Sequence, residues 1–467
     1  MIIFDTLQNR EVEFIPIRAD EVRIYVCGPT LYDHAHLGHA RSAIVFDLLR
    51  RVLEELGYRV VFVKNWTDID DKIIRKIEES GKSLTEITEH YRKSYLQDME
   101  ALNVLPPTYE PKATENIDSM VQLVSSLLKR DIAYRTSSGD IYFDTSKDSQ
   151  YLSLSKRFQD HRESRLENIE KEKRNPGDFV LWKTKRDGDI VYFETEIGEG
   201  RPGWHIECSA MIERHLAYRD EKYSIDIHGG GADLVFPHHE NEASQSRCAT
   251  NRELAKYWLH NGFVKIDGEK MSKSLGNSFF IKDALKHYSG EVLRFYLLST
   301  HYRQDFNFSE EELIKSKKRL DKLYRLKKRI YGTKAGEANP EVRKKILDAL
   351  TSDLNISVAL SVIDEFVSDS NERLDRGEKG KGFKREVIGT IEYISKLLGV
   401  GGKDAYQYFQ FGISEEEREE IENLISQRSK AKKNRDFATA DRIREELQSL
   451  GIQIMDTPNG TIWEKIN

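Results

Sequence analysis

A short string of histidine and glycine, His36-Leu37-Gly38-His39, constrains the fold of this chain more than any other feature. It follows an apolar run at 23–26 that has the composition of a β-strand. After it, apolar residues recur with the spacing of one buried helical face: Val45, Leu48, Leu49, Val52 and Leu56. Gly57 then ends the pattern, as glycine does just past a helix. A helix N-terminus carries unpaired N–H groups and partial positive charge, so we expect it to receive an anion.

A second string, Lys270-Met271-Ser272-Lys273-Ser274, lies far downstream of the first. Gly268 and Gly276 flank it and would allow a loop there to move. Either string alone is most often a solvated turn. Together, in this order and with a strand and a helix around the first, they indicate a site that handles phosphate groups.

The composition limits the class of protein. At 467 residues the chain is too long for one hydrophobic core, so we expect about two to four domains. A hydrophobic content of 38% and a charged content of 33% are typical of a soluble globular enzyme. No run approaches the roughly 20 apolar residues that span a membrane, and Arg10, Glu11 and Glu13 argue against a secretory segment. We therefore predict a cytoplasmic protein with no membrane partner.

The cysteines do not form a disulfide framework. There are three, Cys27, Cys208 and Cys248, and they are widely scattered. In a reducing compartment such residues are core fillers or metal ligands, and nothing in the sequence indicates a role for Cys248.

Strand and helix patterns alternate through the first part of the chain, as in an open parallel sheet. The pattern then changes to a helix near Ile117–Lys129, a hairpin-like stretch at Gly139 and a charged run, which together suggest an insertion that splits the sheet. Sheet signals return at 223–228, and the chain becomes helical beyond Phe308. We expect four parts: an α/β domain of 1–105 with 205–308, an insertion of 106–204, a helical bundle of 309–400 and a C-terminal region of 401–467.

Basic residues gather at 315–329, although the whole chain has a formal net charge of −6. The ordinary interpretation is a solvated helix face. The alternative is a strip that contacts phosphates, which becomes credible only if the rest of the chain implies a polyanionic partner.

The string Pro237-His238-His239-Glu240-Asn241-Glu242 suggests metal ligands. Pro237 suits the first position of a helix, on which His238 and Glu242 would share one face. Cys27 and Cys208 fall at a strand end and after a loop, so they could converge on the same site. Spacing alone does not choose between His238 with Glu242 and His239 with Glu240. A buried cysteine is also more often a small hydrophobic residue than a ligand.

Over essentially its full length the chain resembles the bacterial cysteinyl-tRNA synthetases, which are class I aminoacyl-tRNA synthetases. The matching strings, besides the two above, are Tyr25–Thr30, Asn65–Lys72, Asp178–Lys183, Arg201–Ser209, Asp226–Gly231 and Phe236–Glu242. The resemblance implies an α/β fold: a Rossmann-like class I synthetase catalytic domain with an inserted connective subdomain, followed by an all-α tRNA-binding region. It also implies ligation of L-cysteine to tRNA(Cys) through a cysteinyl-adenylate.

The resemblance further implies roles for individual residues. One Zn²⁺ per chain would be held by Cys27, Cys208, His238 and Glu242, and would bind the sulfur of the substrate. Residues acting on the phosphates of ATP and Mg²⁺ would be His36, His39, Lys270 and Lys273. Residues lining the nucleotide site would be Gly38, Lys273, His228, Gly229 and Gly230. Residues contacting substrate would be Thr67, Trp204 and Asp233.

A zinc ion suits this substrate because an apolar pocket separates cysteine from serine poorly, whereas a metal favours a thiol that ionises easily. The insertion is too short for a full editing domain, in agreement with this. Two alternatives remain: a ligase that joins cysteine to an amino-sugar, and a non-catalytic tRNA-binding or zinc-holding paralogue. The segments Asp353-Leu354-Asn355 and Arg435–Arg444 favour the tRNA enzyme, which we expect to be a monomer.

Overall fold

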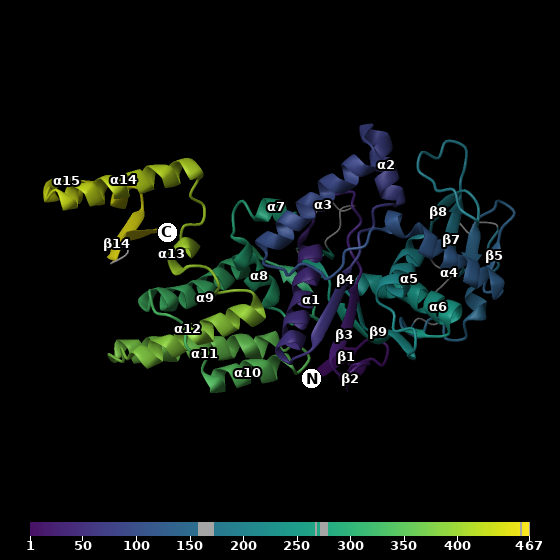
Figure 1. Cartoon of the computed structure of the whole chain (residues 1–467), viewed down its shortest axis with the longest axis horizontal. Helices are drawn as coiled ribbons and strands as arrows, with labels where there is room; N and C mark the ends of the chain where they lie inside the picture. Colours follow the sequence, from purple (N-terminus) through teal and green to yellow (C-terminus); the bar gives the residue numbers. More distant parts are fainter. Residues whose placement is uncertain (157–171, 267–268, 271–278, 458–459, 467) are drawn as a thin grey trace. The chain divides into compact units, whose positions relative to one another are not determined.

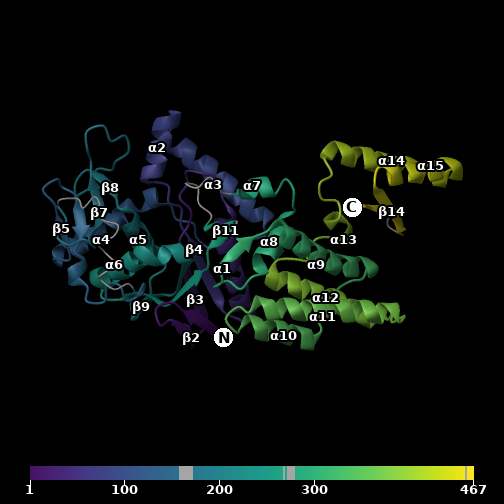
Figure 2. The same ribbon diagram turned by 180° about the vertical axis from the view of Figure 1, so that it is seen from behind.

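The computed structural model, shown in Figures 1 and 2, describes residues 1–156, 172–266, 269–270, 279–457 and 460–466. These residues form two compact units. The first unit comprises Met1–Lys282, Leu297–Ser309 and Leu347–Ser357 within that described set, and the second comprises the rest of the described chain.

A parallel sheet is the centre of the first unit. Its strands, in spatial order, are β10 (Glu253–Asn261), β9 (Tyr223–Gly231), β3 (Glu21–Val26) and β4 (Arg59–Lys64). All three strand pairings are parallel, which confirms the predicted sheet. β4, the next strand along the chain, lies on one side of β3, and β9 lies on the other side. In open α/β sheets ligands bind at the carboxyl ends of the strands beside such a reversal.

Helix α1 (Leu37–Glu55) begins at the predicted histidine string and packs on the sheet. The predicted face is buried at Val45, Leu48, Leu49 and Val52, but Leu56, which follows the last turn as the C-cap, is exposed. Gly57 has a φ of +94°, a conformation that glycine adopts at little cost. The two helices that follow β4 are α2 (Asp71–Ser80) and α3 (Leu84–Ala101).

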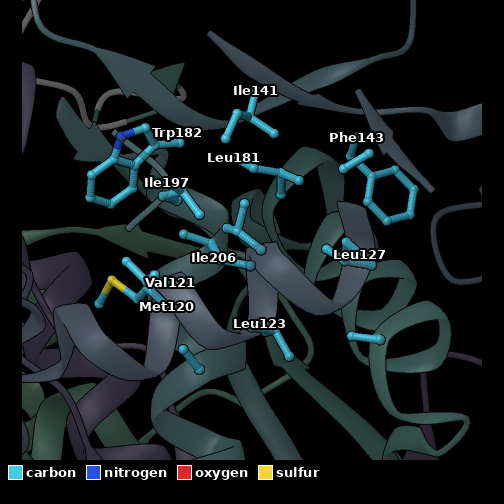
Figure 3. Packing of buried hydrophobic residues seen from close by; sticks show 14 of the residues in the cluster. Met120, Val121, Leu123, Leu127, Ile141, Phe143, Leu181, Trp182, Ile197 and Ile206 are labelled. Carbon is cyan, nitrogen blue, oxygen red and sulfur yellow. The ribbon is translucent and has the colours of Figure 1, made fainter. Parts of the chain in front are cut away.

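The predicted insertion contains a small antiparallel sheet, and the helix expected at Ile117–Lys129 has those bounds in the structure. The strands are β5 (Ala133–Arg135), β6 (Ile141–Phe143), β7 (Phe179–Thr184) and β8 (Gly200–Pro202). Helices α4 (Ile117–Lys129) and α5 (Trp204–His215) pack with this sheet around a common apolar core. Figure 3 shows its centre, where Met120, Leu127, Phe143, Trp182 and Ile206 meet.

Helix α5 belongs to two apolar clusters at once. Ile206 and Ala210 pack into the core of the insertion, whereas Cys208, Met211 and Ile212 pack with residues of the parallel sheet such as Tyr25. Because both faces of α5 are buried, Cys208 is held beside the end of β3.

The remaining elements of the first unit flank the parallel sheet. They are β1 (Ile2–Asp5), β2 (Arg10–Glu13), α6 (Glu240–Thr250), β11 (Val264–Ile266), β12 (Glu269–Lys270) and β13 (Phe306–Phe308). The short helix α7 (Ile281–Ala284) follows at the edge of this unit. Strand β11 pairs with both β12 and β13.

The rest of the chain is mainly helical, as predicted, and Figures 1 and 2 both show α9 to α12 side by side. The helices are α8 (Gly290–Leu298), α9 (Glu310–Arg329), α10 (Pro340–Leu350), α11 (Ile356–Asp375), α12 (Lys381–Leu398), α13 (Ala405–Tyr408), α14 (Glu415–Lys433) and α15 (Phe437–Ser449). The predicted final hairpin consists of β14 (Ile452–Thr457) and β15 (Gly460–Lys465). Among all described helices, none combines the length and the apolar character needed to cross a bilayer.

One local prediction is confirmed and another is too short. Phe236 is extended, with φ −140° and ψ 132°, and Pro237 after it begins a helical turn that leads into α6. His238 and Glu242 therefore lie on one face, as predicted, with Nε2 and Oε1 2.9 Å apart. The glycines after His228 do not follow the strand but continue β9 to Gly231, because β10 pairs with them along their length.

The basic run in α9 is largely neutralised within the protein. Lys317 pairs with Asp321 at 3.0 Å, Arg319 with Asp364 at 2.7 Å, and Lys328 with Glu464. These contacts favour the ordinary interpretation of the run over a strip that contacts phosphates.

Candidate metal and nucleotide site

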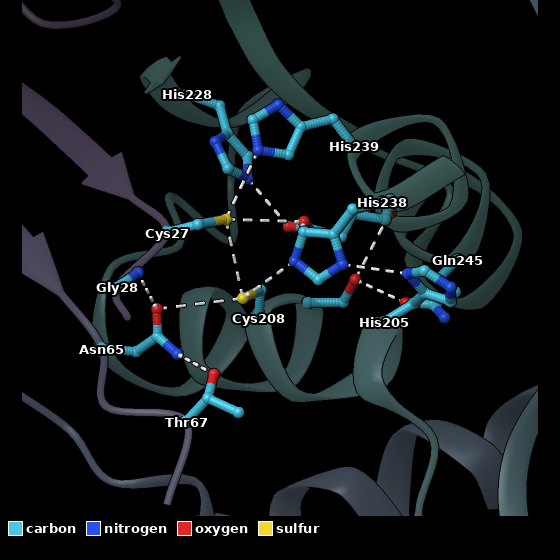
Figure 4. Close-up of polar contacts among 12 residues, drawn as sticks. Cys27, Gly28, Asn65, Thr67, His205, Cys208, His228, His238, His239 and Gln245 are labelled. Atoms are coloured by element: carbon cyan, nitrogen blue, oxygen red, sulfur yellow. Dashed lines mark hydrogen bonds and ion pairs between the residues drawn. The ribbon is translucent and has the colours of Figure 1, made fainter. Parts of the chain in front are cut away.

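Four buried or half-buried side chains from separate elements meet at the carboxyl end of β3 (Figure 4). Cys27 directly follows β3, Cys208 lies on α5, His238 lies in the turn before α6, and Glu242 lies in the first turn of α6. The Cys27 and Cys208 sulfurs are 3.8 Å apart, and His238 Nε2 is 3.6 Å from the sulfur of Cys208. Glu242 Oε1 lies 3.7 Å from Cys27 Sγ and 2.9 Å from His238 Nε2.

These distances fit a tetrahedral zinc ion. With Zn–S bonds of about 2.3 Å and Zn–N or Zn–O bonds of about 2.1 Å, two sulfurs would be about 3.8 Å apart and a sulfur and a nitrogen about 3.6 Å apart. The two cysteines and His238 already have this spacing. Only the distance between His238 and Glu242 is shorter than tetrahedral coordination requires, and it is the length of a direct hydrogen bond.

A second set of four possible ligands overlaps the first. It shares Cys27 and Glu242 and replaces the other two residues with His228 and His239. His239 Nε2 is 3.3 Å from Cys27 Sγ, and His228 Nε2 is 2.8 Å from Glu242 Oε2. The carboxylate of Glu240, by contrast, accepts the backbone N–H groups of residues 152 and 155, so the sequence alternative based on Glu240 finds no support.

Within the cluster, the charged forms of Glu242 and His238 are stabilised by neighbours of opposite charge. Burial raises the pKa of Glu242, but His238 and His228 outweigh it and hold that pKa well below its usual value. Burial lowers the pKa of His238, but Glu242 outweighs it and raises that pKa to about 10. Burial also raises the pKa of Cys208, yet hydrogen bonds from Cys27 and His238 bring it down to about 6, whereas burial raises the pKa of Cys27. One thiol of the pair is therefore readily ionised.

Asn65 is a part of the site that was not predicted as a functional residue. It is buried, and its Oδ1 accepts the N–H of Gly28 at 2.8 Å and lies 3.9 Å from Cys208 Sγ. Its Nδ2 donates to the hydroxyl of Thr67 at 3.3 Å. A Cβ on Gly28 would lie 1.6 Å from the backbone oxygen of Asn65, so only glycine allows this close approach. Asn65 lies directly after the strand β4, where ligands gather in such sheets, and this position was the available signal of its role.

An aromatic layer lies over the cluster of Cys27, Cys208, His238 and Glu242. The indole ring of Trp204 stacks on His238 with centroids 3.9 Å apart, and 38% of Trp204 is exposed. His205 approaches the other nitrogen of His238, with the two Nδ1 atoms 2.9 Å apart, and would orient that ring. A cavity of about 550 Å³ adjoins this layer and is lined by Trp204, His205 and Glu207 together with Lys183 and Arg201.

The predicted phosphate residues His36 and His39 cap α1. The Nδ1 of His36 accepts the N–H of Gly38 at 3.1 Å, and the Nδ1 of His39 accepts the N–H of His36 at 3.2 Å. The two rings stack 3.8 Å apart. Because each Nδ1 is an acceptor, a neutral ring carries its proton on Nε2. The N–H of Leu37 is also paired, to the carbonyl of Phe279, so these N–H groups at the start of α1 are used within the protein.

The glycines predicted to line the nucleotide site lie at the end of β9, next to the metal ligands. A Cβ on Gly230 would be 3.0 Å from the ring of His239. His228 is fully buried, and its ring stacks on Trp258 with centroids 4.8 Å apart, so it faces the metal ligands rather than an open pocket. Asp233, another of the predicted substrate residues, is exposed on the turn after β9.

The second signature string is only partly described. Lys270 is the last residue of β12, paired with Lys265 of β11. Lys273 lies outside the described residues.

The chain matches two known families. The description "tRNA synthetases class I (C) catalytic domain" fits residues 13–318, and "Cysteinyl-tRNA ligase anticodon binding domain" fits residues 414–463. The chain is 61% identical to a cysteine–tRNA ligase of a Nitratiruptor species, with 100% of both chains covered. It is 58% identical to the cysteine–tRNA ligase of Aliarcobacter butzleri, with 99% of each covered, and 56% identical to one from Helicobacter pylori, with 100% of each covered.

Solved structures share the fold at much lower identity. A Mycobacterium tuberculosis methionyl-tRNA synthetase in complex with methionyl-adenylate aligns with a TM-score of 0.58 at 13% identity, covering 81% of this chain and 92% of that one. A ternary complex of Agrobacterium radiobacter LeuRS, tRNA and LeuAMS aligns with a TM-score of 0.60 at 10% identity, covering 84% and 86%. These likenesses agree with the predicted α/β architecture.

Proposed function

This chain belongs to the cysteine–tRNA ligase family of class I tRNA synthetases, and on that premise we propose how its residues carry out the reaction. The enzyme joins L-cysteine to tRNA(Cys) in two steps. The cysteine carboxylate attacks the α-phosphorus of ATP, and pyrophosphate leaves. A hydroxyl of the terminal adenosine of tRNA then attacks the carbonyl carbon, and AMP leaves. Positioning and charge stabilisation account for most of the catalysis in such transfers.

We propose that one Zn²⁺ is held by Cys27, Cys208, His238 and Glu242. The observation that carries this assignment is the spacing of their ligand atoms, which matches tetrahedral coordination at three of the four distances measured. When bound, zinc would favour a substrate group that ionises easily, which separates the thiol of cysteine from the hydroxyl of serine. His205 would orient the ring of His238, and the two remaining imidazoles, of His228 and His239, would support Glu242 and Cys27.

The substrate would bind between this cluster and the start of α1. Thr67 and Trp204 adjoin the cluster, the first through Asn65 and the second by stacking on His238. The Nε2–H groups of His36 and His39 would stabilise negative charge on the α-phosphate as pyrophosphate leaves. We assign Lys270 and Lys273 to the leaving pyrophosphate, and Mg²⁺ would accompany ATP to neutralise its charge.

Two features of the described chain support a tRNA partner. The cavity of about 550 Å³ beside Trp204 offers an aromatic face to a base at the end of a nucleic acid, while its cations Lys183 and Arg201 both pair with Asp71. In the C-terminal region, Phe437 is 61% exposed at the start of α15 and follows the basic run of 428–435. An exposed aromatic beside cations is suited to stacking on an unpaired base.

The match of residues 414–463 to an anticodon-binding family favours the tRNA acceptor over an amino-sugar acceptor. We retain the division into a catalytic domain of 1–105 with 205–308, an insertion of 106–204, a helical domain of 309–400 and a C-terminal region of 401–467 as a proposal. A cytoplasmic location follows from the tRNA partner, and a monomer stays a prediction that light scattering can test.

The proposal is tested by ATP–pyrophosphate exchange with cysteine and with serine, followed by charging of tRNA transcripts. We expect exchange that requires cysteine, and charging of transcripts with a GCA anticodon but not of those with an altered anticodon. Exchange that proceeds equally with serine would contradict the metal-based selection. Exchange without charging of any tRNA would contradict the acceptor.

A further inference from the structure

A second cavity lies at the edge of the parallel sheet and takes no part in the proposed reaction. Its volume is about 400 Å³, and it is enclosed by α1, β4, α3 and the segment 103–110. We call it the edge cavity. Its apolar lining residues are Val26, Ala43, Phe46, Phe62, Leu96, Met99, Val104, Leu105, Pro106 and Pro107.

Of the five charged residues on its wall, Glu100 is exposed on α3, and Asp47 and Arg50 are already satisfied by other parts of the protein. Asp47 binds Arg51 at 2.8 Å and the N–H of Leu105 at 2.9 Å. Arg50 binds Glu54 at 2.8 Å and the carbonyl of residue 106 at 2.7 Å. These groups therefore have little hydrogen-bonding capacity left for a ligand.

Lys64 and Glu110 are different. The ammonium of Lys64 donates to the hydroxyl of Tyr95, which also lines the cavity, and an ammonium has three donors. The ion-pair contact of Glu110 with Arg92 is a long one, at 3.9 Å. Burial lowers the pKa of Lys64 to about 8 and raises the pKa of Glu110, so both groups are poorly solvated.

We propose that the edge cavity is a binding site for a compact, mostly apolar molecule with an uncharged head group that both accepts and donates hydrogen bonds, such as a carboxamide. The walls supply apolar contact along the body of the molecule, and Lys64 and Glu110 supply a donor and an acceptor for its head. Concave apolar sites with a few convergent polar groups are the usual form of small-molecule sites in proteins.

The two charged groups determine the charge of the ligand. A carboxylate head would be attracted to Lys64 but repelled by Glu110, and an ammonium head would meet the opposite pair of effects. A carboxamide avoids both penalties, because its oxygen can accept from Lys64 while its NH₂ donates to Glu110.

The volume limits the size of the ligand. A cavity of about 150 Å³ is sufficient for benzene, so about 400 Å³ accommodates a body of two fused rings with a head group. Naphthalene-2-carboxamide is therefore a suitable probe.

The edge cavity lies directly behind the catalytic site. A Cβ on Gly229 would lie 2.2 Å from Cε1 of Phe46, so this wall residue packs directly against the backbone of β9. Another wall residue, Val26, immediately precedes Cys27. A ligand that displaces either side chain should change the rate of cysteine activation without competing with cysteine or ATP.

Binding is measured by calorimetry on the full-length, zinc-loaded enzyme with naphthalene-2-carboxamide, independently of whether the proposed function holds. We expect saturable binding, and weaker binding of naphthalene-2-carboxylate and 2-naphthylmethylamine. Lys64→Met should weaken the amide about tenfold, the scale of one hydrogen bond to a charged group. Leu96→Trp, which fills the cavity, should abolish binding.

Each variant has a matched control on helix α3. Lys93→Met and Gln97→Trp make the same changes at exposed positions and should bind the amide as the native enzyme does. Equal binding by Leu96→Trp and the native enzyme would overturn the proposal, as would displacement of the probe by saturating cysteine and ATP. Absence of saturable binding by the native enzyme would also overturn it. Retained folding of Leu96→Trp is checked by circular dichroism and thermal unfolding, and Lys64→Met provides the test if that variant does not fold.

Discussion

Replacing Cys208 with serine tests the metal site most directly. The thiol of Cys208 is the group whose pKa falls to about 6 through its neighbours, so it supplies a thiolate at neutral pH. A serine hydroxyl at the same place does not ionise at that pH. The variant therefore loses one charged ligand, while α5 keeps its packing on both sides because the change in side-chain volume is small.

The size of the effect follows from the number of ligands. Removing a residue that only orients a metal ligand weakens metal binding by about 10–100-fold. Removing a ligand itself should cost at least about 100-fold, or about 2.7 kcal/mol. Structural zinc sites gain about 10–16 kcal/mol at neutral pH, so Cys208→Ser should still bind zinc when the metal is plentiful. The difference appears only under competition.

The assay is therefore a chelator titration, with zinc per chain measured by elemental analysis and cysteine-dependent exchange measured in parallel. Cys208→Ser should lose zinc at about 100-fold lower chelator activity than the native enzyme and should lose cysteine activation with it, while ATP binding persists. Cys248→Ser is the matched control, since Cys248 packs against the core of the insertion rather than in the cluster. If Cys208→Ser and Cys248→Ser release zinc alike, Cys208 is not a ligand.

Three further predictions concern other parts of the chain. Gly28→Ala should destabilise the protein by about 1–3 kcal/mol in thermal unfolding, because its Cβ would lie 1.6 Å from a backbone oxygen. Gly382→Ala is the control, because open space surrounds that position and no loss of stability is expected. Equal stability of the two variants would contradict the argument. Asp456→Asn should lower stability by about 1 kcal/mol, since hydrogen bonds from Arg428 hold the pKa of Asp456 well below its usual value at a half-exposed site. This stabilisation is present above about pH 4 and is lost as the pH falls further, so the gap between native and variant should be constant from neutral pH to about pH 5 and shrink below about pH 4; a gap that widens in acid would refute it. Phe437→Ala should weaken tRNA binding by about 1–3 kcal/mol yet leave cysteine-dependent exchange unchanged, and a loss of exchange would instead indicate a folding defect.

Local sequence patterns predicted correctly those elements whose conformation does not depend on pairing with a distant segment. The helix at Ile117–Lys129 has a strong apolar period, and its bounds in the structure are the predicted ones. β9 was predicted too short because its glycines carry no strand signal, and their extended conformation comes from pairing with β10. The helix start at Pro237 was predictable from local chemistry, because proline suits the first helical position and Phe236 just before it is extended.

The candidate site shows more strongly that local patterns do not reveal contacts between residues far apart in the sequence. Cys27 and Cys208 are 181 positions apart, so no local pattern could bring them together, and their assignment as ligands came from family resemblance. The structure places all four ligand atoms in one group, and the identity of the ion stays a prediction that elemental analysis tests. The same reasoning applies to the basic run of α9. Its partners Asp364 and Glu464 lie on other elements, so the sequence alone left its role open.

The segment 27–36 runs from Cys27, a proposed metal ligand, to the start of α1. Hydrogen bonds join it at several points to the loop after β4. Gly28 is bonded to Asn65, and the N–H of Leu31 donates to the carbonyl of Thr67 at 3.0 Å. At its far end the segment terminates in His36, which caps α1. On the proposed roles, the same short stretch would position the sulfur of the substrate through Cys27 at one end and the α-phosphate through His36 at the other. Selection of cysteine and the rate of adenylate formation should then be coupled, and a change that loosens the loop at 65–67 should impair both together.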